Sequence, residues 1–502
     1  MNLLFDTLTR VGAADAPFLE RPDGSVITYG DLDALTGQWA NALVQRGVKP
    51  GDRVAVQVEK SPENLILYLA TVRAGAVFLP LNTAYTLSEL WYFISDAEPA
   101  LIVCDPTVAP RVVEFGMTAT LDAKGQGSLA DLAAASPTAF ETVERGPEDL
   151  AAICYTSGTT GRSKGAMLTH GNLTANAQTL VKLWQFTAAD VLIHALPIYH
   201  VHGLFVATNV IMAAGASMIF RPKFDAAEVL GLMRRASSLM GVPTFYTRLL
   251  DQPGLTAQAT AGMRLFISGS APLLAETHRE FEARTGQVIL ERYGMTETGM
   301  NTSNPYDGAR VAGTVGPPLP DVQLRISDPE TGAVMAAGEI GMIEVRGPNV
   351  FAGYWRMPEK TAAEFKPGGW FITGDLGKID EAGYVHIVGR GKDLIITGGL
   401  NVYPKEVEAE IDALSGVVES AVIGLAHADF GEAVTAVIAT GGKGGLTEEA
   451  VLEALSERLA RFKQPKRVLF VDDLPRNAMG KVQKALLRET HADLYTDASS
   501  GG

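Results

Sequence analysis

Cysteine is nearly absent from this sequence. Its 502 residues include only two, Cys104 and Cys154, and each lies inside an apolar stretch. Two such thiols cannot build a disulfide framework, so the composition favours a reducing compartment.

Long apolar runs are missing as well. No uninterrupted apolar run reaches about 18 residues, the length that a membrane-spanning helix needs. Near the start, Asp6 interrupts the chain before an apolar region of signal-peptide length can form. We therefore expect a cytoplasmic, soluble protein that has no membrane partner.

Basic residues are outnumbered. Lys and Arg total 42 against 57 for Asp and Glu, which gives a formal net charge of −15. Nucleic-acid backbones are bound by clustered Lys and Arg, and no long basic run is present here. The composition thus argues against a nucleic-acid partner, and a small anionic substrate would need a local basic pocket.

The sequence does contain a regular alternation of strand and helix patterns. Ser61-Pro62-Glu63 is typical of a helix start, and Thr86 with Glu89 has the spacing of a capping box. The alternation continues to about residue 320 and predicts a layered α/β architecture with largely parallel sheet. Shorter β segments between Gly and Pro turns are expected over 321–390, as a β-rich subdomain.

A domain boundary is expected near Gly389-Arg-Gly-Lys-Asp393. We predict an N-terminal domain over 1–390, a hinge over 391–394 and a small, mobile C-terminal α+β domain over 395–502. Within the last domain the patterns predict a helix from Pro404, strands near 417–424 and 433–440, a helix over 447–461 and a strand over 467–471.

The segment Tyr155-Thr-Ser-Gly-Thr-Thr-Gly-Arg-Ser-Lys-Gly165 directly follows an apolar strand. Its glycines let the backbone present N–H groups to an anion, and its hydroxyls can donate to phosphate or bind Mg²⁺. Lys164 adds a positive charge. The Walker A pattern is absent, and a plain polar hairpin is the alternative. The high proportion of glycines and hydroxyl side chains in this segment, together with the lysine, favours a phosphate-binding loop.

This segment resembles the phosphate-loop signature of the adenylate-forming superfamily, which contains acyl-CoA synthetases, peptide-synthetase adenylation domains and beetle luciferases. Further segments resemble the other motifs of that superfamily, in order: Tyr293-Gly-Met-Thr-Glu297, Phe371-Ile-Thr-Gly-Asp375, Gly389-Arg390 with Gly398-Gly399, and Leu474-Pro-Arg-Asn-Ala-Met-Gly-Lys481. The resemblance implies an ATP-dependent ligase that forms an acyl-adenylate, releases pyrophosphate and then makes a coenzyme A thioester.

The resemblance also implies roles for the matching residues. Glu297 with Thr156 would hold Mg²⁺, and Lys481 would bridge the carboxylate under attack and the α-phosphate. Asp375 would accept the ribose hydroxyls with Arg390 beside it. The other residues implied to bind ATP or coenzyme A are Ser157, Gly158, Thr159, Thr160, Gly161, Lys164, Tyr293, Thr296, Gly398 and Gly399.

Two alternatives concern these assignments. Asp375 and Arg390 could form a purely structural ion pair, and Lys481 taken alone could be an ordinary surface lysine. Because the small domain carries both Lys481 and the Gly398 loop, the resemblance implies that this domain rotates about Lys392 between the two half-reactions.

Residues at the acyl end depart from the general pattern of the superfamily. Arg292 precedes the Tyr-Gly-Met-Thr-Glu motif where most relatives have glycine, Ser270 replaces a glycine or alanine, and His200 and His202 lie close together. A buried, unpaired arginine would be costly beside an alkyl chain, whereas it could bind a second substrate carboxylate bidentately. The motifs most closely resemble those of malonyl-CoA synthetases, which implies malonate as substrate and methylmalonate as a further candidate.

Other functions stay open from the sequence. Arg292 could pair with Glu291 or another protein carboxylate and face away from the ligand, which would suit a medium-chain or aryl monocarboxylate. His202 could be structural. From another class, the chain could be an inactive ATP-binding paralogue, although Glu297 and Lys481 argue against this. The sequence gives no sign of an obligatory protein partner.

Overall fold

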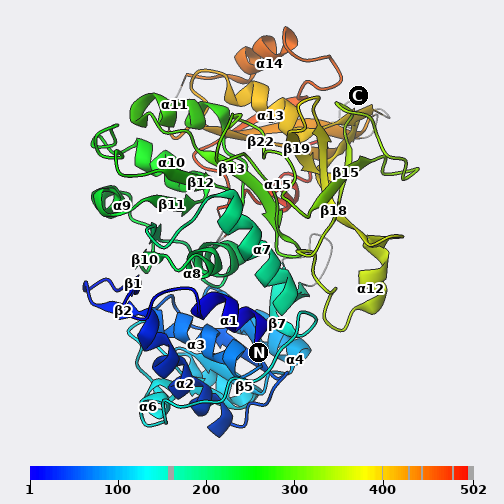
Figure 1. Ribbon diagram of the computed structural model, residues 1–502. Helices are drawn as coiled ribbons and strands as arrows, with labels where there is room; N and C mark the ends of the chain where they lie inside the picture. Colours follow the sequence, from blue (N-terminus) through cyan, green and yellow to red (C-terminus); the bar gives the residue numbers. More distant parts are fainter. Residues whose placement is uncertain (157–162, 398–399, 428–429, 443–444, 478–479, 496–502) are drawn as a thin grey trace. The chain divides into compact units, whose positions relative to one another are not determined.

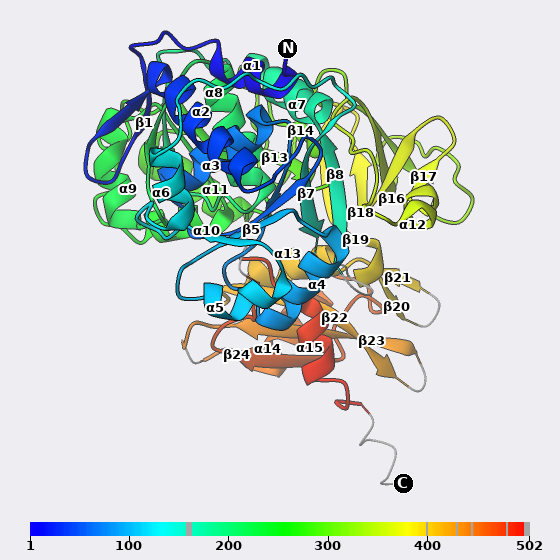
Figure 2. The same ribbon diagram turned by 90° about the horizontal axis from the view of Figure 1, so that it is seen from below.

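The computed structural model describes residues 1–156, 163–397, 400–427, 430–442, 445–477 and 480–495 (Figures 1 and 2). The chain divides into two compact units. The first consists of Met1–Leu324 and Val345–Phe371, and the second of Arg325–Glu344 and Ile372–Gly502. The predicted hinge at 391–394 lies inside the second unit, and the predicted domain limits stay a prediction.

A six-stranded sheet lies in the first unit, in the order β6-β5-β3-β4-β7-β8. Its strands are parallel except β8, which returns antiparallel to β7, and Figure 2 shows these two side by side. Strands such as β5 are buried along their whole length, which explains their continuous apolar sequences. The bounds are β3 (Arg53–Gln57), β4 (Val77–Pro80), β5 (Leu101–Cys104), β6 (Thr118–Thr120), β7 (Leu150–Thr156) and β8 (Lys164–Thr169).

A second sheet of this unit has eight strands, in the order β14-β13-β12-β11-β9-β10-β1-β2. Neighbouring strands are parallel except in the end pairs β13–β14 and β1–β2. The bounds are β1 (Pro17–Glu20), β2 (Val26–Thr28), β9 (Val191–His194), β10 (Ser217–Phe220), β11 (Ser238–Gly241), β12 (Leu265–Ser268), β13 (Leu290–Met295) and β14 (Gly299–Ser303).

The parallel arrangement of this second sheet positions the candidate site. The segments Leu196–Gly203, Gly269–Ser270 and Thr296–Thr298 follow the carboxyl ends of β9, β12 and β13. Carboxyl ends of parallel strands share one edge of a sheet, where ligands of α/β proteins commonly bind. Three segments that are distant in sequence therefore meet at one edge.

Two helices of this unit begin where the sequence predicts. The Ser61 side chain caps α3, and Thr86 forms a capping box with Glu89 at α4. Figure 1 shows α1, α7 and α8 gathered together, and α7 contacts both α1 and α8. The helices of this unit are α1 (Leu3–Thr9), α2 (Tyr29–Gln45), α3 (Pro62–Arg73), α4 (Leu87–Ala97), α5 (Ala109–Val112), η1 (Val113–Phe115), α6 (Ser128–Ala134), α7 (His170–Leu183), the π-helix η2 (His202–Thr208), α8 (Asn209–Ala213), α9 (Ala226–Leu232), η3 (Met233–Arg235), α10 (Pro243–Leu250), α11 (Ala275–Thr285) and α12 (Pro358–Ala363).

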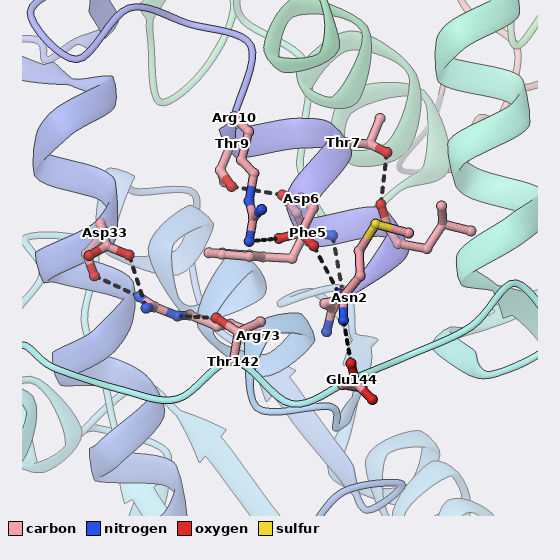
Figure 3. A network of polar contacts seen from close by, with 12 residues as sticks. Asn2, Phe5, Asp6, Thr7, Thr9, Arg10, Asp33, Arg73, Thr142 and Glu144 are labelled. Atoms are coloured by element: carbon pink, nitrogen blue, oxygen red, sulfur yellow. Dashed lines mark hydrogen bonds and ion pairs between the residues drawn. The ribbon is translucent and has the colours of Figure 1, made fainter.

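A network of polar contacts fixes the start of the chain (Figure 3). The Asn2 side chain caps α1 by accepting from the Phe5 N–H at 3.1 Å, and Asp6 pairs with Arg10 at 2.8 Å. Arg73 of α3 pairs with Asp33 of α2 at 2.9 Å. Asn2 Nδ2 also donates to the Val72 carbonyl of α3 at 2.8 Å, so the network joins α1, α2 and α3.

A five-stranded sheet follows in the order β15-β16-β18-β17, with β19 paired to β18. It confirms the short strands expected over 321–390. The bounds are β15 (Gln323–Ser327), β16 (Gly341–Arg346), β17 (Phe365–Lys366), β18 (Trp370–Ile379) and β19 (Val385–Arg390).

The end of the second unit is a sheet with helices on both faces. Val422, Val434 and Ile438 point into a core shared with α13 and α14, whereas their neighbours Ile423 and Val437 join a core with α15. The strand order is β21-β20-β23-β22, with β24 beside β23. The elements are η4 (Gly391–Asp393), β20 (Ile395–Thr397), β21 (Leu400–Val402), α13 (Pro404–Asp412), β22 (Glu419–His427), β23 (Gly431–Ala439), α14 (Glu448–Ser456), β24 (Arg467–Val471) and α15 (Lys484–Thr490).

Most expected elements of this unit are present, and one differs in length. The helix predicted over 447–461 ends at Ser456. The chain tightens there, because the N–H groups of Arg458 and Leu459 both bond to the Leu455 carbonyl. Leu459 is buried although it lies beyond the helix, so the apolar pattern of the sequence extends past Ser456. A helix end predicted from that pattern is therefore too late. None of the described helices combines the length and apolar character needed to cross a bilayer.

Candidate active site

Arg292 is a buried cation at the acyl end of the candidate site. Its exposed fraction is 3%, and its Nε and Nη2 atoms have no hydrogen-bond partner in the described part of the chain. Burial lowers the pKa of Arg292 to about 9, and the nearby Tyr246 acts in the opposite direction. Buried polar groups are normally hydrogen-bonded, so this guanidinium is ready to receive an anion.

Glu291 does not neutralise Arg292. Successive side chains of a strand point to opposite faces, and Glu291 Oε1 accepts from the Gly313 N–H at 3.2 Å. No ion pair of Arg292 occurs among the residues that the structure describes. The outward, Glu291-paired arrangement of Arg292 is therefore not the one present.

His202 lies beside Ser270 at the same end. Its Nδ1 is 3.2 Å from Ser270 Oγ, while its Nε2 is buried and has no partner within the described ranges. Burial, and then the charges of Arg292, His200 and His194, lower the pKa of His202 well below its ordinary value. The imidazole is therefore neutral, with one nitrogen able to donate and the other to accept.

The backbone around this group is tight. A Cβ atom on Gly269 would lie 2.4 Å from Cζ of Arg292, so a larger residue there would displace the guanidinium. Ser270 has a φ of 72°, in the left-handed region that non-glycine residues rarely adopt. His200 Nδ1 accepts from the His202 N–H at 3.2 Å and so helps to fix the segment between them.

The sequence did not reveal what lies behind His202. His202 opens the π-helix η2, a form often found at functional sites. Lys60 Nζ donates to His194 Nδ1 at 2.9 Å, and His194 Nε2 donates to the Gly203 carbonyl at 2.9 Å. Lys60 and His194 thus support the first turn of η2. The one available signal was that His194 ends a buried strand just before the histidine segment.

At the other end of the candidate site, a buried carboxylate meets a phenol. Glu297, 5% exposed, lies in the turn between β13 and β14. Its Oε1 is 3.1 Å from Oη of Tyr354, which is also 2.6 Å from Glu364 Oε2. Lys164 Nζ lies 3.0 Å from Glu364 Oε1. Tyr354 and Glu364 carry no motif signal of their own, and the sequence analysis missed them.

Thr156 and Lys164 are brought together as cross-strand partners in β7 and β8. Thr156 Oγ1 donates to the Lys164 carbonyl at 3.5 Å. Tyr293 and Thr296 are partly buried within one to four residues of Glu297 in sequence. Some candidate residues lie outside the described residues: Ser157, Gly158, Thr159, Thr160, Gly161, Gly398 and Gly399.

The donor set at Glu297 fits Mg²⁺. The described residues contain no group of three or more His, Cys, Asp or Glu side chains that could hold a metal ion by itself. Mg²⁺ is typically bound by one or two carboxylates together with substrate phosphates and water. A single buried carboxylate such as Glu297, close to a phosphate-loop segment, has that character.

In the second unit, Asp375 and Arg390 are partners. They face each other across β18 and β19, and Arg390 Nε lies 2.8 Å from Asp375 Oδ1. Asp375 is buried, whereas Arg390 is partly exposed. The pair fits both a ribose-binding role and a structural role.

Lys481 lies in a short hairpin of the same unit. Its N–H donates to Asn477 Oδ1 at 3.0 Å, and its carbonyl accepts from the Asn477 N–H at 2.9 Å. Arg476 pairs with Glu419 of β22 and donates to the Gly480 carbonyl at 2.8 Å. The backbone that presents Lys481 is therefore anchored to the sheet.

Similar proteins identify this arrangement. The family "AMP-binding enzyme" matches residues 9–355, and the family "AMP-binding enzyme C-terminal domain" matches 406–481. The crystal structure of ATP-bound MatB from Rhodopseudomonas palustris is 63% identical, with a TM-score of 0.97, covering 98% of this chain and 99% of that one.

Curated relatives match over most of their length. A malonate–CoA ligase from Arabidopsis thaliana is 34% identical, covering 94% of this chain and 85% of the relative. A feruloyl-CoA synthase from an Amycolatopsis species is 35% identical, covering 93% and 94%. The ordered motifs, the α/β fold and these matches agree, and the chain belongs to the AMP-binding enzyme family.

Proposed function

We propose that this chain is a malonate–CoA ligase that works through malonyl-adenylate. The observation that carries the proposal is Arg292, a buried guanidinium whose Nε and Nη2 atoms have no partner in the described structure. A dicarboxylate supplies the missing acceptor, because one carboxylate can pair with Arg292 while the other reacts. The similarity to MatB and to a malonate–CoA ligase supports the same substrate.

The reaction has two steps. A carboxylate oxygen of malonate attacks the α-phosphorus of ATP, the bond to the bridging oxygen of the β-phosphate breaks, and pyrophosphate leaves. The thiolate of coenzyme A then attacks the acyl carbonyl carbon, and AMP leaves with the electrons of the broken C–O bond. Negative charge grows on phosphate oxygens in the first step, so positioned cations lower its barrier.

We assign the charged residues to these steps as follows. Lys164 binds the β- and γ-phosphates, and Lys481 stabilises the carboxylate as it attacks. Asp375, with Arg390, accepts the ribose hydroxyls. Mg²⁺, held by Glu297 and Thr156, would neutralise phosphate charge when bound.

The neutral His202 and Ser270 complete the acyl end. Once the distal carboxylate pairs with Arg292, one nitrogen of His202 can donate to it, and the Ser270 hydroxyl fixes the orientation of the ring. A monocarboxylate leaves the guanidinium unpaired. Sites built for a polar group reject analogues that lack it by roughly 10⁴-fold or more, whereas one added methyl changes binding by only about 1–3 kcal/mol.

The test is thioester formation with ATP, Mg²⁺ and coenzyme A against a panel of acids. The panel contains malonate, methylmalonate, succinate, acetate, octanoate and 4-coumarate. We expect malonate to lead, methylmalonate to follow, and acetate to be slower by orders of magnitude. A preference for octanoate or 4-coumarate would overturn the dicarboxylate assignment and leave the ligase assignment standing. ATP binding without turnover of any acid would favour an inactive paralogue.

A further inference from the structure

The hydroxyl of Tyr354 lies between Glu297, the candidate Mg²⁺ ligand, and the side chains that bind Lys164, the candidate phosphate-binding residue. Tyr354 is 2% exposed, and its backbone forms a bridge with Ala166 of β8. Its Oη lies 3.1 Å from Glu297 Oε1 and 2.6 Å from Glu364 Oε2. Glu364 Oε1 in turn lies 3.0 Å from Lys164 Nζ. A continuous path of polar contacts therefore runs from Glu297 through Tyr354 and Glu364 to Lys164.

The Tyr354 hydroxyl cannot donate equally strong hydrogen bonds to both Glu297 and Glu364. A tyrosine hydroxyl has one proton, so a strong hydrogen bond from Tyr354 to one carboxylate weakens the bond to the other. Burial, and then the two carboxylates, raise the pKa of Tyr354 well above its ordinary range, so the hydroxyl stays protonated. The shorter distance shows that Glu364 is the preferred acceptor in this structure.

Lys164 is bound in two ways at this point. Its Nζ pairs with Glu364 and lies 4.1 Å from the centroid of the Tyr354 ring. Glu364 has a second cation, because Lys360 Nζ lies 2.9 Å from the same Oε1. If Lys164 moves to a phosphate, Glu364 therefore keeps a counter-ion, and the exchange leaves no buried charge unpaired.

We propose that Tyr354 is a positioning residue that couples metal binding at Glu297 to phosphate binding by Lys164. The proposal rests on the roles assigned above to Glu297 and Lys164. With Glu297 engaged by a metal ion, the Tyr354 hydroxyl donates to Glu364 alone. The stronger hydrogen bond withdraws charge from that carboxylate and weakens its attraction for Lys164. Lys164 is then more readily available to the phosphates of the nucleotide.

The test variant is Tyr354→Phe, which keeps the aromatic ring and removes only the hydroxyl. The ring packs against Phe351 at a centroid distance of 4.8 Å, and that contact is retained. ATP binding to the full chain is measured by calorimetric titration, once with Mg²⁺ and once with EDTA, with no acid present. We expect the gain in ATP affinity on adding Mg²⁺ to shrink about tenfold, because hydrogen bonds to charged groups contribute on that order.

Matched variants decide how the result is read. Tyr306→Phe removes a hydroxyl from a tyrosine outside the path, and we expect the Mg²⁺-dependent gain to be unchanged. An equal loss of ATP affinity with Mg²⁺ and with EDTA in Tyr354→Phe would mean a purely structural role and overturn the proposal. If Tyr354→Phe does not fold, Glu364→Gln tests the same path with the phenol in place and should also reduce the gain.

Glu297→Gln separates failure of this proposal from failure of the metal assignment. If it abolishes the Mg²⁺-dependent gain while Tyr354→Phe leaves the gain intact, Glu297 keeps its role and the coupling through Tyr354 is wrong. If neither variant changes the gain, the assignment of Glu297 is wrong as well, and the coupling falls with it. The choice of malonate as substrate is unaffected by either outcome.

Discussion

The two ends of the candidate site in the first unit treat charge differently. At the acyl end, Arg292 and His202 bury nitrogen atoms that have no partner in the described structure. At the phosphate end, Lys164 and Glu297 already contact protein groups, Glu364 and Tyr354 respectively. A ligand at the acyl end would therefore add a hydrogen-bond partner that is missing, whereas a ligand at the phosphate end would replace a protein group that is already in contact.

The difference determines where selectivity arises. An anion that reaches Arg292 removes the cost of an unpaired buried charge, so binding there depends strongly on whether the acid carries a second carboxylate. A phosphate that reaches Lys164 must replace Glu364, so much of its gain offsets a contact that is lost. We therefore expect substitutions at the acyl end to have the larger effects.

The largest effect is expected for Arg292→Met. Loss of a buried charge pair costs about 3–5 kcal/mol, so kcat/KM for malonate should fall about 10²- to 10⁴-fold. Activity with acetate, which cannot use the guanidinium, should not fall. Steady-state kinetics with both acids checks this, and Arg279→Met, an exposed position in α11, is the control. Equal losses with malonate and acetate would contradict the assignment.

A second substitution tests whether the two half-reactions depend on a hinge at Lys392 in the second unit. Lys392 is exposed in η4, next to Asp393, which pairs with Arg488 at 2.5 Å. Proline fixes φ and removes an N–H, so Lys392→Pro should restrict a hinge at this position. We expect thioester formation to fall about 100-fold and ATP–pyrophosphate exchange to change only about threefold. Lys392→Ala is the control, and equal loss of both half-reactions would reject the hinge.

A smaller effect is expected at the phosphate end. Lys164→Met removes a cation that also has a protein partner, so KM for ATP should rise about tenfold while KM for malonate stays the same. Initial rates with each substrate varied in turn provide the measurement. Lys182→Met removes an exposed lysine of α7 and should change neither constant. A rise in KM for malonate alone would place Lys164 at the wrong end of the site.

The smallest effect concerns pH. Burial and neighbouring positive charge lower the pKa of His202 well below 6.5, so the ring stays neutral as the pH falls through the ordinary histidine range. Between about pH 8 and about pH 6, KM for malonate should change less than about twofold. Protonation of the ring would add positive charge and lower KM. A several-fold drop that His202→Gln abolishes would therefore show that the ring does titrate.

The sequence predicted those structural features that depend on a local sequence pattern. The helix start at Ser61, the capping box at Thr86 and the strand at 467–471 were all predicted, because caps and periodicity are local properties. The resemblance implied that His202 and Ser270 share the acyl end, and the 3.2 Å contact between their side chains is a finding of the structure. The family assignment was confirmed by the matched regions.

Other features depend on residues that are distant in sequence. Tyr354 and Glu364 acquire their importance only because β8 brings Lys164 beside them. Lys60 likewise meets His194 only through tertiary packing, and nothing in its local sequence marks it as buried. A motif search finds the groups that react, but not the groups that hold them in place.

Ser270 illustrates a conflict between stability and selectivity. A left-handed backbone costs a non-glycine residue about 1 kcal/mol or more, and glycine at this position would remove that strain. The same replacement would delete the hydroxyl that fixes the His202 ring. A mutant library selected only for thermal resistance should therefore be enriched in Ser270→Gly, while selection for growth dependent on malonate activation should retain serine.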